Sequence, residues 1–250
     1  MPAVGFLLLA LAWELAPRLG AVNPQFFPPF SVLVRELAHL ALTQEFWAYI
    51  ASTIRTWAIG LVFATVAGVA AGLVIGLVPG ARRYTHSTIE FLRPIPSVAL
   101  IPGVILIFGS RYQSGVVLIT YAAFWQVLIQ MLYGLNDIDT VARDTARSFR
   151  LGTWGYVRHV AWPTLLPFLF TGVRLAASIA LVLAVTAEMV IGTFGIGRGI
   201  VVAQTSAAVP TMYALVIVAG LLGVGINAAA RVLERRVLRW HPSVRNVEAL

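Results

Sequence analysis

The chain has 250 residues, of which 59% are hydrophobic and 11% charged, and its mean hydropathy is +0.86. This composition excludes a soluble domain, and it leaves room for about five or six membrane spans of roughly 20 residues each. The absence of cysteine excludes disulfides and thiolate metal sites, and the absence of lysine excludes a Walker-type nucleotide site. The net charge of +8 does not indicate a nucleic-acid partner, because the arginines flank apolar segments and form no basic domain.

The sequence predicts an all-α membrane protein with about six transmembrane helices in a single domain of residues 1–250. Continuous apolar runs place the spans at about 3–19, 50–78, 89–108, 115–135, 163–191 and 210–230. Pro79 and Gly80 end the second span, since neither residue continues a helix readily. A polar, arginine-rich insert at 139–162 separates the fourth span from the fifth.

The arginines are distributed unevenly between the two sides of this layout. If the insert is cytoplasmic, the cytoplasmic side holds Arg82, Arg83, Arg143, Arg147, Arg150, Arg158, Arg231, Arg235, Arg236, Arg239 and Arg245. The opposite side holds only Arg18, Arg35, Arg111 and Arg198. The positive-inside rule therefore predicts a multi-pass membrane protein with both termini in the cytoplasm.

The second span carries glycines at intervals of four residues, at positions 68, 72, 76 and 80. Such a stripe allows another helix to approach closely. Packing within the chain is favoured over a dimer interface.

Residues in two spans are candidates for lining a translocation pathway. The third span contains Arg93, Pro94, Pro96 and Pro102, and broken backbone at membrane depth faces either protein or a watery cavity. A packing kink is an equally good interpretation. In the fifth span, Arg174 could meet an anionic substrate, although a structural role is favoured, and Glu188 lies near the outer face.

The glycine-rich segment 192–199 has the spacing of a dinucleotide-binding loop, but no strand precedes it and no acidic residue follows in 210–230. We expect a flexible external loop or gate there. The histidines are scattered and predict no metal site. No nucleophile and base stand together, so we expect neither catalytic residues nor a cofactor in this chain.

The insert at 139–162 is predicted to form two short helices joined by an elbow at Gly152. Arg143, Arg147 and Arg150 share a face of the first helix, and Asp144 lies three residues from Arg147. A second helix is expected at 154–160, ending before Pro163. An elbow of this kind could press into a groove on a partner, burying the apolar residues Val141, Phe149, Leu151 and Tyr156 while its arginines meet carboxylates.

At these residues the chain resembles the inner-membrane permeases of binding-protein-dependent ABC importers. Their cytoplasmic signature is Glu-Ala-Ala, then glycine after three residues, then an apolar residue and a proline. Asp144, Thr145 and Ala146 occupy the Glu-Ala-Ala positions, Ala161 the apolar position and Pro163 the proline, while Arg150 stands where glycine is expected. Four further segments are similar to the nitrate, sulfonate and taurine branch of these permeases: WELAPRLGAVNP, RPIPSVALIP, PTLLPFLFTGVRLAAS and VTAEMVIG.

The resemblance implies a type I permease subunit of the bacterial plasma membrane that is not itself an enzyme. Two permease copies, preferably identical, would form the pathway in the bilayer, two ATPase subunits carrying ATP and magnesium would dock on the elbow, and an external binding protein would deliver the solute. It implies coupling roles for Asp144, Ala146, Arg147, Arg150, Gly152, Tyr156, Arg158 and Pro163. The solute would be a small organic or inorganic anion such as a sulfonate, taurine or nitrate.

Two other functions are compatible with an apolar helical bundle. A secondary transporter or channel would need buried acidic residues and inverted repeats, and the sequence shows neither clearly. An intramembrane enzyme would need convergent catalytic side chains, and none stand out.

Overall fold

The computed structural model describes residues 2–78 and 80–239, and every regular element in them is helical. The elements are α1 (Pro2–Arg18), α2 (Phe30–Leu40), α3 (Gln44–Leu77), α4 (Ala81–Leu92), a 3-10 turn (Ser97–Leu100), α5 (Ile101–Phe108), α6 (Tyr112–Asn136), α7 (Thr140–Ser148), α8 (Thr153–Tyr156), a π-turn (Val157–Ala161), α9 (Trp162–Ile191), α10 (Ile196–Thr205) and α11 (Val209–Val237). The predicted all-α fold is confirmed. Pro79, His241 and Arg245 lie outside the described residues.

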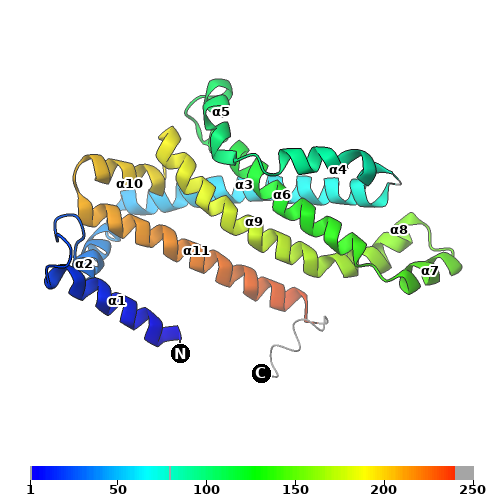
Figure 1. Cartoon of the computed structure of the whole chain (residues 1–250), viewed down its shortest axis with the longest axis horizontal. Helices are drawn as coiled ribbons and strands as arrows, with labels where there is room; N and C mark the ends of the chain where they lie inside the picture. Colours follow the sequence, from blue (N-terminus) through cyan, green and yellow to red (C-terminus); the bar gives the residue numbers. More distant parts are fainter. Residues whose placement is uncertain (1, 79, 240–250) are drawn as a thin grey trace.

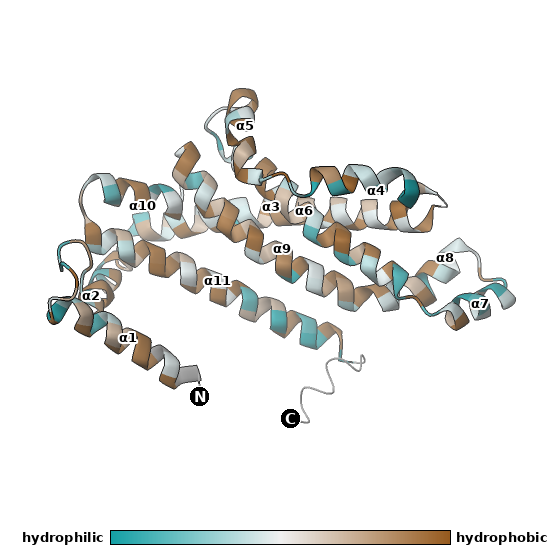
Figure 2. Cartoon of the chain, in the orientation of Figure 1, coloured by the Kyte–Doolittle hydropathy of each residue, from teal (hydrophilic) through white to brown (hydrophobic). Residues whose placement is uncertain are grey.

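Three long helices form the centre of the bundle. α3, α6 and α9 run side by side along the long axis of the molecule (Figure 1). Ile119, Val127 and Met131 of α6 are completely buried between the other two helices, together with Leu165 of α9. Apolar residues dominate these helices, while polar residues gather on α7 and on the C-terminal part of α11 (Figure 2). The interior is therefore built chiefly from segments predicted to span the membrane.

The glycine stripe of α3 packs against α6 of the same chain, which confirms the favoured interpretation. A Cβ added at Gly68 would lie 2.8 Å from the Val127 side chain, and one at Gly72 would lie 2.6 Å from the Met131 side chain. Glycine is needed because these two helices approach too closely for any larger residue. Gly80 is different, since it precedes α4 with a left-handed φ of +83°.

The segment predicted as the third span, 89–108, is divided into two arms. α4 ends at Leu92, and the 3-10 turn and α5 continue at 81° to it. Pro94 and Pro96 lack backbone donors and prevent the helix from continuing between the arms. Tyr121 of α6 donates a hydrogen bond to the Leu92 carbonyl at 2.7 Å, so one carbonyl freed at this helix end is satisfied.

The second helix of the insert is continuous with α9, which corrects the prediction of a separate helix at 154–160. α8, the π-turn and α9 form one helical rod of 39 residues from Thr153 to Ile191. The Trp162 amide donates to the Val157 carbonyl, five residues back. Pro163 has no donor and crowds the preceding turn, so a wider π-turn replaces regular α-helix there.

The segment predicted as a flexible loop at 192–199 is also different. Only residues 192–195 lack helical structure, and α10 begins at Ile196 and packs against α9, α11 and α3. The loop prediction was wrong for residues 196–199, where Gly197 and Gly199 allow close packing of a short helix, while Gly192 ends α9 with a left-handed φ of +78°.

Four helical segments of the described chain are long and apolar enough to cross a membrane, or five if α4 and the bent segment after it count as one span. Six spans were expected. α1 occupies the first predicted span but has only 17 residues. It packs on α2, where Ser31 donates to the Glu14 carboxylate through its amide at 2.8 Å and its hydroxyl at 2.9 Å.

Candidate functional site

The insert forms a protruding elbow at one end of the bundle, built from α7, α8 and the turn between them (Figure 1). Asp139 caps α7, and its side chain accepts a hydrogen bond from the Val141 amide at 2.9 Å. Ala146 is 4% exposed and faces the bundle. Arg147 and Asp144 are exposed to solvent, with 3.7 Å between Nη1 and Oδ1 and side-chain exposures of 76% and 72%. An ion pair this exposed contributes little to folding, so both groups remain available to a partner.

The turn of the elbow is made at Arg150, where the permease signature has glycine. Arg150 adopts a left-handed φ of +50°. Its amide donates to the Arg147 carbonyl at 2.9 Å, and the Leu151 amide donates to the Ala146 carbonyl at 3.0 Å. These two bonds form a Schellman motif, in which glycine is the usual residue at the left-handed position. The elbow therefore keeps the geometry that a glycine would give, with an arginine held in a less favourable backbone conformation.

Two predictions about the elbow need correction. Gly152 was expected to break the helix, but its φ of −62° and ψ of 170° suit any residue, and the break lies at Arg150. Arg143, Arg147 and Arg150 were expected to share one helical face, but Arg150 lies beyond the end of α7. The sequence could not show this, because the chain reverses direction within the predicted helix.

The second half of the elbow joins it to the bundle. Tyr156 is half-buried and packs against the central core, so it is not part of the exposed surface that was predicted. Arg158 is exposed, and Pro163 lies just after the π-turn within the continuous rod. α8 and α9 thus share one rod, which joins the elbow to the bundle.

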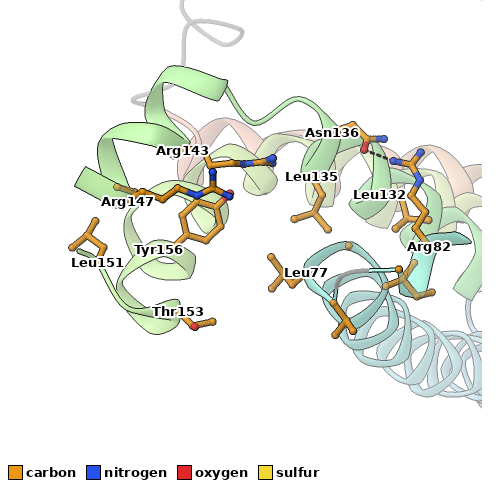
Figure 3. A pocket seen from close by; sticks show the side chains of 15 residues that line it. Leu77, Arg82, Leu132, Leu135, Asn136, Arg143, Arg147, Leu151, Thr153 and Tyr156 are labelled. Atoms are coloured by element: carbon orange, nitrogen blue, oxygen red, sulfur yellow. Dashed lines mark hydrogen bonds between the residues drawn. The ribbon is translucent and has the colours of Figure 1, made fainter. Parts of the chain in front are cut away.

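Large apolar side chains project from the elbow. Phe149 is 76% exposed, Trp154 75%, Val141 68% and Leu151 42%. All of these except Trp154 were predicted to be buried against a partner. A cavity of about 620 Å³ lies between the elbow and the ends of α3 and α6, with Arg143, Arg147 and Tyr156 on one side and Leu77 and Leu135 on the other (Figure 3). Exposed apolar groups beside arginines are typical of a surface that binds another protein.

The predicted pathway residues of the third span lie at the bend after α4. Arg93 and Pro94 line a cavity of about 480 Å³ together with Ile129, Leu132 and other residues of α4 and α6. Pro96 and Pro102 are exposed and are not among its lining residues.

The two charged residues of the fifth span make contacts within the chain. Arg174 Nη1 lies 3.1 Å from Glu234 Oε2, an ion pair that ties α9 to α11. This contact matches the structural role favoured for Arg174. Glu188 is 2% exposed, and its Oε2 accepts hydrogen bonds from the Thr53 hydroxyl and the Gly197 amide, both at 2.9 Å. It thereby fastens α10 to α3 and α9.

Close packing explains the glycines around Glu188. A Cβ at Gly195 would lie 2.2 Å from the Glu188 carboxyl carbon, and one at Gly197 would lie 2.2 Å from the Val185 carbonyl oxygen. Gly195 and Gly197 lie within ten residues of Glu188, but Thr53 precedes Glu188 by 135 residues, so the sequence does not show that the three elements meet. Arg55 of α3 had no predicted role, although a charge within an apolar span was a usable signal.

The comparisons with known proteins agree with this architecture. The chain is 28% identical over 242 residues to the taurine transport system permease protein TauC of Escherichia coli (strain K12), which covers 95% of this chain and 88% of that protein. It is 28% identical over 193 residues to the nitrate import permease protein NrtB of Leptolyngbya laminosa, and this match covers 77% of this chain and 69% of that protein. It is 27% identical over 252 residues to the bicarbonate transport system permease protein CmpB of Synechococcus elongatus, and this match covers 96% of this chain and 89% of that protein.

Solved structures and a family model give the same assignment. A chain of the MetNI methionine ABC transporter, solved in inward-facing conformations, superposes with a TM-score of 0.68 over 79% of this chain and 98% of that chain. At 19% identity, this match concerns the fold, which is that of a type I ABC importer permease. Residues 64–239 match the family model described as "Binding-protein-dependent transport system inner membrane component". The chain belongs to this family of multi-pass membrane permeases.

Proposed function

We propose that this chain is the permease subunit of an ATP-driven importer for a small anion such as a sulfonate, taurine or nitrate. The observation that carries the proposal is the elbow, which presents exposed Phe149, Trp154, Asp144 and Arg147 beyond the end of an apolar bundle. Taurine, nitrate and bicarbonate, named for three similar permeases, are all small molecules that carry an anionic group.

The elbow lies in the cytoplasm in this proposal, and so do both termini. Arg143, Arg147, Arg150 and Arg158 gather at this end of the bundle, which supports the orientation through the positive-inside rule. The membrane is the bacterial plasma membrane, and an external binding protein delivers the solute to the end that carries α10.

Two permease copies, preferably identical, form the pathway, and two ATPase subunits bind one elbow each. ATP and magnesium act on those subunits, and this chain contributes no catalytic residue. Closure of the ATPases draws the elbows together. The rod of α8, the π-turn and α9 carries that motion into the bundle as a rigid body, so the pathway changes from inward-open to outward-open.

The test is co-purification of the tagged permease with its ATPase from native membranes. The expected result is a stable complex with two ATPases and two permease copies. The double variant Asp144→Ala, Arg147→Ala should lose ATPase association and uptake. Arg111→Ala changes an exposed arginine at the opposite end of the bundle and should lose neither.

Two results would contradict the proposal. One is the absence of an ATPase from an active transporter, which would favour a secondary transporter or channel. The other is unchanged uptake and unchanged ATPase association in the double variant. A complex with one copy of this chain and one of a different permease would contradict only the homodimer.

A further inference from the structure

Arg55 is a charged residue inside the apolar helix α3. It lies 11 residues after the start of α3, about 16 Å along the helix, and its side chain is exposed. Among residues 2–78 and 80–239, no carboxylate oxygen lies within 4.0 Å of its guanidinium, whereas Arg174 is paired with Glu234. A charge placed at such depth usually faces a cavity or pathway and not lipid.

The Arg55 guanidinium is held over an aromatic ring. Its central carbon lies 5.1 Å from the centre of the Tyr112 ring. A guanidinium that stacks on a ring keeps its N–H donors at the edge of its plane, where they can bind a planar or tetrahedral oxyanion in pairs.

A second arginine lines the same cavity. The cavity has a volume of about 310 Å³ and lies at the end of the bundle opposite the elbow, between α3, α10 and the loops before α6 and α10. Its lining residues are Ser52, Arg55, Thr56, Ser110, Tyr112, Gly192, Thr193, Phe194 and Arg198. They include two cations and several hydroxyl groups but no carboxylate, so the cavity has the charge of an anion site.

The buried contacts around Glu188 hold the two arginines on one side of the bundle. Thr53 precedes Arg55 by two residues, and its hydroxyl accepts a hydrogen bond from the Ile196 amide at 3.0 Å. Gly197 directly precedes Arg198, and its amide donates to Glu188. The backbone segments that carry both arginines are thus joined to each other through the same buried hydrogen bonds.

We propose that Arg55 and Arg198 bind a small oxyanion at the mouth of the pathway, on the side that receives the solute. This inference rests on the proposed function for its orientation and for the class of solute. The shared chemistry of sulfonate, nitrate and bicarbonate is a negative charge spread over several oxygens, which arginine forks match better than a point charge does. A phospholipid headgroup offers similar oxygens, and the experiment separates the two sources.

The experiment uses the permease with its co-purified ATPase, without binding protein, in nanodiscs of zwitterionic phosphatidylcholine. Methanesulfonate and nitrate are titrated by calorimetry, with choline chloride as the control for ionic strength. Saturable binding is expected for the wild type. Arg55→Gln and Arg198→Gln should each weaken it about tenfold or more, since each removes a charged hydrogen-bond donor. Arg111→Gln, an exposed arginine outside the cavity lining, should leave it unchanged.

Folding and lipid binding are checked in the same preparations. Arg55→Lys and Arg198→Lys keep the charge without the fork and should give intermediate affinities, with elution profiles like the wild type. If Arg55→Gln does not fold, the two Arg198 variants decide the outcome. Three results would overturn the inference: no saturable binding of either anion, equal weakening by all three glutamine variants, or arginine-dependent retention of anionic phospholipid without anion binding.

Failure of this inference is distinguishable from failure of the proposed function. Loss of anion binding leaves ATPase co-purification intact. If no ATPase co-purifies, the proposed function fails, and the same titration is made on the permease alone.

Discussion

Replacing Phe149 by alanine should release the ATPase while leaving the permease folded. Phe149 ends α7 and is 76% exposed, so the bundle gains little from its ring. If a partner groove buries that ring, about 150 Å² leaves water, which is worth about 3 to 4 kcal/mol at 25 cal/mol per Å². Allowing for incomplete burial, we expect about 2 to 4 kcal/mol, or roughly 30- to 1,000-fold weaker association.

Phe26 provides a matched control for this variant. It is also a phenylalanine, it is 67% exposed, and it lies in the loop before α2, at the opposite end of the bundle. Association with the purified ATPase is measured by surface-immobilised binding, and folding by the thermal unfolding midpoint in detergent. Phe26→Ala should bind like the wild type. Equal affinities of the two variants for the ATPase would show that the partner does not bury Phe149. A loss of binding would also not support that contact if the unfolding midpoint fell in Phe149→Ala alone.

Three further predictions concern the glycines and the elbow turn. Gly72→Ala should lower the unfolding free energy by about 1 to 3 kcal/mol, since its Cβ would meet Met131 at 2.6 Å. Gly220→Ala is the control, because its Cβ would lie in open space and the change should be neutral or stabilising. Equal unfolding midpoints for the two variants would contradict the close packing at Gly72. Arg150→Gly should be about 1 kcal/mol more stable than Arg150→Ala, because both lose the guanidinium but only alanine keeps the left-handed strain. Chemical denaturation compares the stabilities of the two variants, and a more stable alanine variant would count against the Schellman turn. Gly197→Ala should reduce uptake and raise the protease sensitivity of α10, because its Cβ would lie 2.2 Å from a backbone carbonyl that cannot move aside. Unchanged proteolytic digestion of the variant would contradict the close packing of α10 on α9.

The sequence predicted the parts of the fold that depend on local chemistry. Hydropathy located the long helices, and the four-residue glycine spacing correctly favoured packing within the chain. Proline was less reliable. Pro94 and Pro96 divide a predicted span into two arms at 81°, while Pro163 lies within a continuous rod because a π-turn absorbs its missing donor. The effect of a proline depends on whether the preceding turn can widen, and the sequence alone does not reveal that.

The candidate site was predictable in outline and not in its contacts. The elbow was located correctly, with Asp144 and Arg147 exposed on it, but its turn was predicted at Gly152 and lies at Arg150. Glu188 was given little weight because it lies near the outer face, and its bond to Thr53, 135 residues away, could not be seen in the sequence. Long-range hydrogen bonds of this kind follow from packing, which periodicity does not encode.

Site-directed cross-linking in native membranes tests directly whether the elbow is the cytoplasmic surface that binds the ATPase. The chain has no cysteine, so a single cysteine at Trp154, which is 75% exposed, carries a photo-cross-linker without background labelling. A cysteine at Phe26 serves as the control for the opposite face. We expect Trp154→Cys to cross-link to the ATPase and to be shielded from a membrane-impermeant thiol reagent added outside, while Phe26→Cys reacts with that reagent. A Trp154→Cys variant that reacts from outside, or that cross-links to no ATPase in an active transporter, would contradict it.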